Sequence, residues 1–549
     1  MIRDISQYHQ QTKHHPYRHA RALGYMDWET QPDPFRRFTG APGHRLAFGS
    51  EAEGPLWDDI YDPAGQKAQA LGKVSVSDLF YYSLALSATK QYMDNQWHLR
   101  CNPSSGNLHP TEAYLLAPPL DEIHSDAALY HYAPYEHALE RLVDLEEGTS
   151  KALFSTLPAE SCLVALSSIY WRESWKYGER AFRYCHHDVG HAIAGIALSA
   201  SLLGWQTRVL EAVGGAEIAT LLSIEQQTGV EAEHADCLLA LFPADSDVTS
   251  PLLDGWRVPE RVLAHMKRRP HAYVPNRLSE DHHDWPIIDQ ASRLSEHPAR
   301  IGVSSWRPSV TSFEVEPPAR RTVSARAIIR SRRSVQAMDG TTEMDGPAFF
   351  RTLARLVPTE GRPPFAAWPW QPAVHPVFAV HRVRGLASGL YILVRDPAQI
   401  ESLQSVMTFD ASSSVAEDVL PGLPFYLIKA GDFSDSAENV SCNQAIASGG
   451  VFATMMLAWF QGPLEERGAW FYPRLHWEAG MVGQVLYLEA EAQGMRGTGI
   501  GCFYDDSIHE LLGIRDLRMQ SLYNFTVGGA VEDPRLSDLP AYSHLRISE

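Results

Sequence analysis

The chain repeats itself at a fixed spacing, and this repeat constrains the fold more than any other feature. The segment HHDVGHAIAGIALSASLLGW begins at His186, and HWEAGMVGQVLYLEAEAQGM begins at His476, a shift of 290 residues. The pairs that match at this shift include His186/His476, Asp188/Glu478, Gly190/Gly480, Leu198/Leu488, Ala200/Ala490 and Gly204/Gly494. The register continues from IATLLSI to IHELLGI further along. Shared helical periodicity could produce some of these matches, but one register held this long favours two copies of one fold.

Proline marks the boundary between the copies. Nine prolines lie between Pro251 and Pro318 among charged and polar residues, a composition that interrupts long regular elements. We therefore expect a first domain with an N-terminal extension over residues 1–255, a Pro-rich connector over 256–320 and a second domain over 321–549. A chain of 549 residues can supply sizeable cores for two domains.

The two copies have the same predicted order of elements. In each, a helix and a loop precede a strand hairpin, a long buried helix, a short strand and a last helix. The hairpin reads TEAYLLAP and AALYHYAP in the first copy, and VFAVHRV and GLYILVR in the second. Because few parallel crossover units are indicated, the predicted class is α+β.

Charge and hydropathy exclude several classes of partner. The 47 basic and 66 acidic residues give a net charge of −19, which disfavours nucleic acid or an anionic membrane. The longest apolar run, Ala192 to Trp205, is too short to span a bilayer. The N-terminus lacks a signal-peptide pattern and the six cysteines lack CxxC spacing, so we expect a cytoplasmic protein without a zinc ribbon or disulfide framework.

Two polar stretches are each present in one copy only. RCNPSSGNLHPTEAY, Arg100 to Tyr114, precedes the first hairpin and is dense in small hydrogen-bonding residues, although such residues also form ordinary turns. RRSVQAMDG, Arg332 to Gly340, follows a predicted helix in the second copy, where paired arginines are also typical of a solvated helix end. Each copy thus carries what the other lacks.

Four motifs together resemble the nitroreductase-like flavoprotein superfamily. NPSSGNLHPTEAY resembles its Pro-Ser-Ser-x-Asn loop, and RRSVQAMDG resembles its opening motif. GMRGTGIGCFYDDSIHELLGI resembles the turn beside the flavin ring, and FTVGGAVEDPR resembles the C-terminal basic segment. The pair Lys176-Tyr177 is similar to that of the SagB-type azoline dehydrogenases. The resemblance covers most of residues 75–245 and 321–540.

This resemblance implies an intertwined dimer with FMN at the interface, built here as an internal pseudo-dimer of two fused domains. One composite flavin site is then expected, while the pseudo-symmetric second site has lost both groups of ligands. The residues implied for FMN are Arg332, Arg333, Ser334, Gln336, Gly499, Ile500, Gly501, Cys502 and Arg535 from the second copy and Pro103, Ser104, Ser105 and Asn107 from the first. Lys176 and Tyr177 are implied as catalytic groups for the substrate proton, each able to become a base if desolvated.

These residue types suit the cofactor. The phosphate dianion of FMN matches the fork-like guanidinium donors of Arg332 and Arg535. Asn and Ser side chains offer neutral donors to the ring, and glycine lets backbone N–H groups approach it closely. Two departures weaken the match: Gln336 stands where relatives commonly have Arg or Lys, and Arg535 could instead pair with Asp533 at the surface.

The segment HDVGH, His187 to His191, mimics the metalloprotease H-E-x-x-H pattern. Asp is one carbon shorter than Glu, and the matching segment of the second copy, WEAGM, keeps the helix without either histidine. We therefore predict interface packing here and no metal. The histidines of TKHHPYRH near the N-terminus are likewise expected at the surface rather than as ligands.

The sequence thus predicts an FMN-dependent oxidoreductase that moves a hydride between FMN and a small-molecule or peptide substrate. The Lys-Tyr pair favours the dehydrogenase direction. A nitro or quinone reductase using NAD(P)H is one alternative, and a flavin-free scaffold or peptide-binding partner is another. Kinship of fold does not identify the substrate, the electron acceptor or the oligomeric state.

Overall fold

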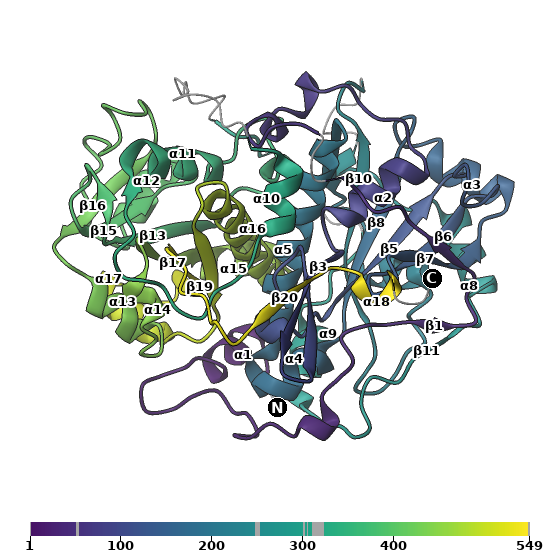
Figure 1. Ribbon diagram of the computed structural model, residues 1–549, viewed down its shortest axis with the longest axis horizontal. Coiled ribbons are helices and arrows are strands. Elements are labelled where there is room, and N and C mark those ends of the chain that lie inside the picture. The colour runs from purple at the N-terminus through teal and green to yellow at the C-terminus, as the bar shows by residue number, and fades with distance from the viewer. Residues whose placement is uncertain are drawn as a thin grey trace.

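Two halves, each an antiparallel sheet covered by helices, meet along a pair of long helices at the centre of the molecule (Figure 1). The computed structural model describes residues 2–50, 54–246, 253–299, 302, 304, 306–309 and 323–546. Helix α5 (Ala181–Leu202) of the N-terminal half packs against α16 (Tyr472–Glu491) of the C-terminal half. All residues of α5 and nearly all of α16 are buried, so both helices serve as core for two halves at once.

The N-terminal half is built on a seven-stranded sheet in the order β2-β7-β6-β5-β8-β10-β9. Every neighbouring pair is antiparallel. The strands are β2 (Gly43–Arg45), β5 (Thr111–Ala117), β6 (Ala128–Ala133), β7 (Ala138–Asp144), β8 (Cys162–Ser168), β9 (Trp205–Val209) and β10 (His234–Pro243). The predicted hairpin corresponds to β5 and β6, which are buried throughout because the sheet is covered on both faces.

The C-terminal half repeats this arrangement in a six-stranded antiparallel sheet, ordered β16-β15-β13-β17-β19-β18. Its strands are β13 (Val374–Val380), β15 (Gly389–Leu393), β16 (Phe425–Ala430), β17 (Phe452–Trp459), β18 (Arg496–Ile500) and β19 (Met519–Gly528). From β7 to β9 the first sheet matches this order position by position, and α5 and α16 occupy the same place in their halves. The predicted second hairpin corresponds to β13 and β15.

Shorter helices cover the sheets. Those of the N-terminal half are α1 (Ile5–Gln11), α2 (Lys73–Tyr81), α3 (Glu147–Phe154), α4 (Tyr170–Tyr177), α6 (Gly215–Leu222), α8 (Glu260–Arg268) and α9 (Pro286–Leu294). Those of the C-terminal half are α10 (Ala325–Ser331), α11 (Gly346–Leu356), α12 (Ile400–Gln404), α13 (Ser434–Val440), α14 (Ile446–Gly449), α15 (Gln461–Arg467), α17 (Asp505–Leu512) and α18 (Ser543–Arg546). Within the described ranges, none of the helices combines the length and the apolar character needed to cross a lipid bilayer.

The connector predicted over residues 256–320 is more regular than its proline content indicated. It contains α8 and α9, each of nine residues. Pro259 caps the start of α8, and Pro286 is the first residue of α9. Proline is tolerated at these positions because the first backbone N–H groups of a helix have no partner inside it. Proline therefore starts regular elements here instead of interrupting them.

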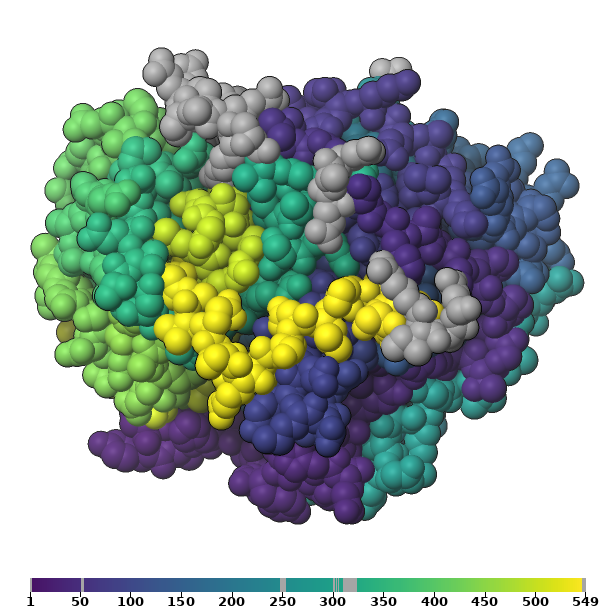
Figure 2. Space-filling view, viewed as in Figure 1, coloured from purple at the N-terminus to yellow at the C-terminus, as the bar shows by residue number. Residues whose placement is uncertain are grey.

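The two halves exchange their chain ends. Strand β20 (Ser537–Pro540) pairs with β3 (Leu86–Tyr92) of the N-terminal half, which pairs in turn with β4 (Asn95–Arg100). Figure 2 shows this C-terminal segment, in yellow, crossing from the green half onto the blue one. At the other end, Tyr8 of α1 packs edge-on against Phe182 and Tyr472. Two small sheets, β1 (Phe38–Thr39) with β11 (Val274–Pro275) and β12 (Met344–Asp345) with β14 (Val383–Arg384), complete the fold.

Candidate active site

Segments from both halves converge beside the crossing of α5 and α16. Arg332, directly after α10, donates from Nε to the carbonyl oxygen of Cys101 and from Nη2 to that of Arg100, both at 2.8 Å. On the other side, the Tyr184 hydroxyl of α5 donates to the carbonyl oxygen of Gly501 at 3.0 Å. These contacts join the predicted ligands of the C-terminal half to the polar loop of the N-terminal half, although more than 220 residues separate them.

Arg332 is buried and Arg333 is half-buried, and not all of their donors form hydrogen bonds. Arg332 lies over the ring of Tyr487, and burial lowers its pKa. Burial and the neighbouring Arg332 charge lower the pKa of Arg333 to about 10. Within the described part of the chain, Nη1 of Arg332 and Nε of Arg333 are buried without a hydrogen-bond partner, although Arg333 Nε lies 4.0 Å from Asp538 Oδ2 in an ion pair. Buried donors of this kind are rare in folded proteins and suit an acceptor that is not part of the chain.

A tyrosine hydroxyl connects the arginine motif to the end of β18, since Gly499 and Ile500, predicted as part of a turn, are the last two residues of this strand. The Tyr487 hydroxyl bonds to Oγ of Ser334 and accepts the N–H of Gly499, each at 2.9 Å. Gly499 must be glycine because a Cβ there would overlap the Tyr523 hydroxyl, and a Cβ on Gly501 would collide with the Tyr184 ring. Aromatic side chains thus fix the backbone at Gly499 and Gly501, and Ile500 between them is buried.

The polar loop forms a single 3-10 turn, Ser105–Asn107, after the buried Pro103. Ser104 Oγ accepts the N–H of His109 at 2.8 Å, and Ser105 N–H donates to Asp188 Oδ1 at 3.3 Å. Asn107 donates to the carbonyl oxygen of His98 at 2.8 Å, and its Oδ1 lies 3.0 Å from His109 Nε2. The loop is therefore held in one conformation by its own half of the molecule.

Lys176 and Tyr177, at the end of α4, lie directly against this loop. Gly106 has a φ of 61°, and a Cβ at this position would stand 2.7 Å from the Tyr177 hydroxyl and 3.1 Å from Lys176 Nζ. Lys176 Nζ lies 5.3 Å from the centre of the Tyr177 ring, which in turn packs edge-on against Tyr184. The structure thus places Lys176 and Tyr177 side by side with the polar loop.

The expectation that desolvation makes Tyr177 a base is wrong. Burial and the nearby Glu173 carboxyl raise the pKa of Tyr177 well above its ordinary value. Burial disfavours the phenolate because the charged form loses its hydration, so at neutral pH the side chain is a phenol. Tyr177 can therefore donate a hydrogen bond or a proton, and a base must come from another group.

Two buried carboxyl groups, which sequence reasoning did not select, lie in the same cluster. Glu173 Oε1 accepts a hydrogen bond from Ser104 Oγ at 3.4 Å, and Asp188 accepts from the loop backbone. Burial raises the pKa of Asp188 to about 8; burial and the Asp188 charge raise that of Glu173. One oxygen of each has no partner among the described residues. The one signal in the sequence was the repeat, which aligns Asp188 with Glu478.

Asp188 and Glu478 differ in their environments. Glu478 is ion-paired with Arg395 and accepts the backbone N–H of Ala373 at 2.9 Å and that of Val374 at 3.2 Å. Asp188 has no ion-pair partner within the described ranges. The carboxyl in the C-terminal half is therefore a structural anchor, whereas that in the N-terminal half keeps an oxygen available for proton exchange.

Three of the residues predicted to bind FMN are less well placed for this role than Arg332 and Arg333. Gln336 is exposed, and the side chain of Arg535 is 71% exposed and ion-paired with Asp533 at 2.7 Å. Arg535 thus forms a surface ion pair with Asp533, two residues before it in the chain. This is the alternative that the sequence left open for Arg535. Cys502 is half-buried, and a hydrogen bond with the Cys442 thiol lowers its pKa.

The histidines of the H-E-x-x-H-like segment pack in the interface. His187 stacks on Tyr523 at a ring distance of 4.3 Å. His191 lies 3.2 Å from both the Tyr523 hydroxyl and Gln484 Oε1. These contacts support the interpretation of this segment as interface packing.

His14, near the N-terminus, is buried and not at the surface as expected. Possible ligand atoms of His14, His19 and Cys502 lie within 4.8 Å of one another. However, His14 Nδ1 accepts the N–H of Ala20 at 2.9 Å, which places the ring proton on Nε2. In this form the His14 ring has no free lone pair for a cation.

Residues 86–239 match the model of the Nitroreductase family. This segment is therefore similar to nitroreductase family domains. It contains the polar loop, the Lys-Tyr pair and α5. A candidate nitroreductase from Methanocaldococcus jannaschii is 30% identical over 128 residues, which are 23% of this chain. The match covers 64% of that relative's length.

The nitroreductase-like fold extends through both halves. The crystal structure of a candidate nitroreductase from Anabaena variabilis superposes with a TM-score of 0.67 at 19% identity, covering 96% of this chain and all of that one. A chain of the microcin synthetase complex McbBCD from E. coli, bound to truncated pro-MccB17, covers 33% of this chain and 66% of its own length with a TM-score of 0.26 and 19% identity. That likeness is too low to test the SagB-type hypothesis.

Proposed function

We propose that the protein is an FMN-dependent oxidoreductase in which two duplicated nitroreductase-like domains form one composite flavin site. The observation that carries the proposal is the meeting of complementary motifs at one interface. Arg332 of the C-terminal half holds the backbone that leads into the loop Pro103–Asn107 of the N-terminal half. The matching order of the two sheets supports the duplication. Each half supplies a ligand group that the other lacks.

The residues present fit FMN. The unpartnered Nη1 of Arg332 and the guanidinium of Arg333, which has Asp538 4.0 Å away as its ion-pair partner, match the acceptor oxygens of a phosphate. Ser334 is exposed beside them, and its hydroxyl also bonds to Tyr487. The backbone around Gly499 and Gly501, with the serines of the polar loop, would lie at the ring. Gln336 and Arg535 are not needed for this assignment.

When bound, FMN would supply the two-electron hydride chemistry. The chain's own groups divide the remaining tasks. Tyr177, as a phenol, would donate a hydrogen bond to a substrate heteroatom, and Lys176 would place a positive charge beside it. As the hydride passes to the flavin, the substrate proton would go to the carboxyl group of the Glu173–Asp188 pair that is ionised, where burial favours the proton-bound form. This division suits a SagB-type dehydrogenase acting on a small or peptide-derived substrate.

A second candidate is a nitro or quinone reductase that takes its hydride from NAD(P)H. The family of the domain at residues 86–239 favours it. Both candidates require flavin, whereas a flavin-free scaffold does not. The absorbance spectrum of the purified protein, with identification of the released flavin, tests the proposal, and a colourless protein that fails to take up added FMN would refute it. Rapid anaerobic bleaching by NADH or NADPH would favour the reductase.

A further inference from the structure

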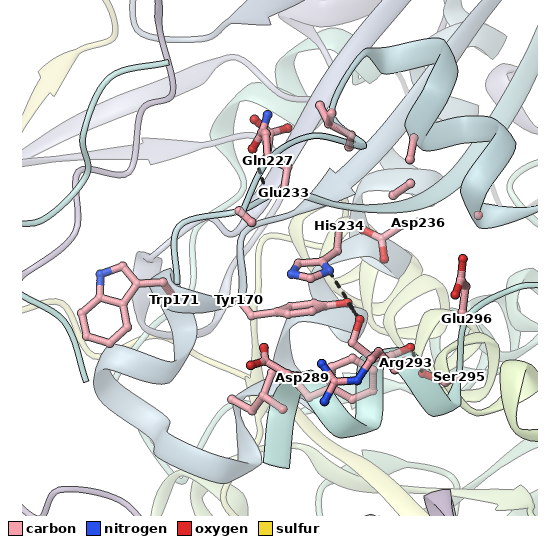
Figure 3. Close-up of a pocket in the computed structure, with 18 of the residues that line it drawn as sticks. Tyr170, Trp171, Gln227, Glu233, His234, Asp236, Asp289, Arg293, Ser295 and Glu296 are labelled. Carbon is pink, nitrogen blue, oxygen red and sulfur yellow. Dashed lines mark hydrogen bonds between the residues drawn. The ribbon is translucent and has the colours of Figure 1, made fainter. Parts of the chain in front are cut away.

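A cavity of about 650 Å³ lies between α4, β10, α6, α9 and the start of α16. Figure 3 shows Tyr170 and His234 at its centre, with Asp236, Arg293 and Glu296 around them. The candidate flavin ligands and the Lys176-Tyr177 pair are not among the residues that line it. The cavity is therefore a separate site whose use does not depend on the proposed function.

The cavity has a buried cation in its lining. Arg474 of α16 is 4% exposed, and its guanidinium lies 4.3 Å from the centre of the Trp477 ring. It donates from Nη1 to the carbonyl oxygen of Trp470 at 2.8 Å, while its Nε has no partner in the described part of the chain. No ion pair joins Arg474 to a carboxylate of the described residues, and burial lowers its pKa to about 9. A buried charge without a counterion is costly unless a ligand supplies one.

His186 supplies a neighbouring donor. It is 2% exposed, and its Nδ1 accepts the indole N–H of Trp477 at 3.1 Å. The ring proton therefore lies on Nε2, which is buried without a partner among the described residues. Trp285, which also lines the cavity, has an equally unpartnered indole N–H. Three buried donors thus line one space, and none of them has a hydrogen-bond partner among the described residues. The Asp236 carboxyl group lies nearby, with Oδ1 3.5 Å from His186 Nδ1.

The acidic residues of the cavity do not satisfy these donors. Asp236 accepts a hydrogen bond from Ser168 Oγ at 2.7 Å, and burial raises its pKa to about 7, so it is a weak counterion for Arg474. Asp284, Asp289 and Glu296 are exposed at the rim. A negatively charged rim disfavours polyanions such as phosphate but admits a single charge that reaches Arg474.

We propose that this cavity binds a small organic monocarboxylate with an aromatic or other apolar body. The carboxylate would accept from Arg474 and His186, since a guanidinium is well suited to a carboxylate. The body would pack against aromatic rings that line the same space, Tyr170, Phe182 and Trp477. Within the repeat, Arg474 of the C-terminal half corresponds to Tyr184 of the N-terminal half, at the shift of 290 residues. Tyr184 packs on Tyr177 in the candidate active site, so Arg474 occupies the corresponding position in the other half.

Calorimetric titration of the full-length protein tests the proposal with three probes: benzoate, its neutral isostere benzamide, and inorganic phosphate. We expect benzoate to bind and the other two to bind at least about tenfold more weakly, the loss for one charge-assisted hydrogen bond. Arg474→Met should weaken benzoate binding by at least the same factor. Arg518→Met, at an exposed arginine outside the cavity lining, is the matched control and should bind benzoate normally.

Stability separates a ligand-binding role of Arg474 from a structural one. Because Arg474→Met removes an unpaired buried charge, its Tm without ligand should equal or exceed that of the wild type, while stabilisation by benzoate is lost. If that variant does not fold, His186→Gln should also weaken benzoate binding, because it alters the second donor. Equal binding of benzoate and benzamide, or of benzoate to the wild type and the folded variant, would overturn the proposal. So would the absence of benzoate binding to the wild type.

Discussion

Gly190 of α5 and Gly480 of α16 lie against one another where the two helices cross. A Cβ on Gly480 would stand 3.0 Å from the Cα of Gly190 and overlap the carbonyl oxygen of His187. A Cβ on Gly190 would overlap the carbonyl oxygen of Trp477. Residues 187 and 477, like 190 and 480, are separated by 290, so the two contacts are reciprocal. Such reciprocity is typical of a twofold interface between two copies of one fold.

Gly480→Ala should destabilise the protein by about 1–3 kcal/mol or more, because the added methyl group meets a backbone that cannot move aside easily. Urea denaturation followed by circular dichroism measures the change. The control is Gly462→Ala in α15, where a Cβ would meet no atom within 4 Å. There the helix preference of alanine should give no loss or a slight gain. Equal stability of the two variants would contradict the close crossing.

The complementary motifs predict about one FMN per chain. The Arg-Arg-Ser motif occurs in the C-terminal half and the Pro-Ser-Ser-x-Asn loop in the N-terminal half. When His109-Pro110 of the first copy is aligned with His375-Pro376 of the second, Ser104 corresponds to Trp370. The second copy therefore lacks this serine. Flavin released by denaturation, quantified against protein, checks the ratio. A ratio near two or near zero would exclude a single composite site.

Arg332→Ala and Asn107→Ala should both weaken FMN binding, although the two residues lie in different halves. Loss of a charged hydrogen bond at Arg332 should cost roughly 1.5–3 kcal/mol, and loss of a neutral one at Asn107 about 1 kcal/mol. Arg332 also holds the backbone that leads into the loop, so its effect should be the larger. Titration of apoprotein with FMN gives both affinities. Arg535→Ala, at an exposed and ion-paired arginine, should have little effect.

The elements that were predicted correctly depend on local patterns. The two hairpins and the long helices α5 and α16 follow from apolar runs bounded by turn residues, and the repeat placed them in corresponding positions. The exchange of chain ends was not predictable, because the pairing of β20 with β3 joins residues about 450 positions apart. Nothing in either short strand specifies its partner.

Only those residues of the candidate site that belong to a recognisable sequence motif could be predicted. Glu173 and Asp188 meet the polar loop over separations of 69 and 83 residues, and neither carboxyl belongs to a motif that implied this contact. Arg535 is the opposite case, and its role as a ligand stays a prediction. A motif implied a phosphate ligand, but an aspartate two residues away forms the pair that the structure contains. Burial, which determines the pKa of Tyr177, is likewise a property of the assembled fold and not of the local sequence.

Lys176→Ala and Tyr177→Phe should retain the flavin spectrum but slow substrate-driven flavin reduction by at least about tenfold, since acid–base groups typically contribute 10²–10⁴ in rate. Anaerobic stopped-flow bleaching with an azoline-bearing peptide is the measurement. Tyr17→Phe, at a residue that is 92% exposed, and Lys151→Ala on α3 are matched controls that should reduce normally. Unchanged rates in both test variants would make the pair structural. A colourless variant would mean that the pair contacts the cofactor.

Asp188→Asn should change how stability depends on pH. Burial raises the pKa of Asp188 from 3.8 to about 8, so the fold accommodates the protonated form. Between these values the unfolded chain has released the proton that the folded chain retains, and wild-type stability therefore falls as pH rises. Asparagine does not titrate and can still accept the N–H of Ser105. The Tm of the variant minus that of the wild type should thus increase steadily between pH 5 and pH 8.

A matched control for this titration is Asp339→Asn. Hydrogen bonds from Thr341 and Thr342 lower the pKa of Asp339 to about 2, so this carboxylate is ionised in the folded and the unfolded chain across the same range. The Tm difference for Asp339→Asn should therefore stay constant from pH 5 to pH 8, because neither state exchanges a proton there. If the difference for Asp188→Asn is equally flat, Asp188 is ionised in the folded protein. Asp188 would then hold no proton at neutral pH, and any proton of the pair would lie on Glu173.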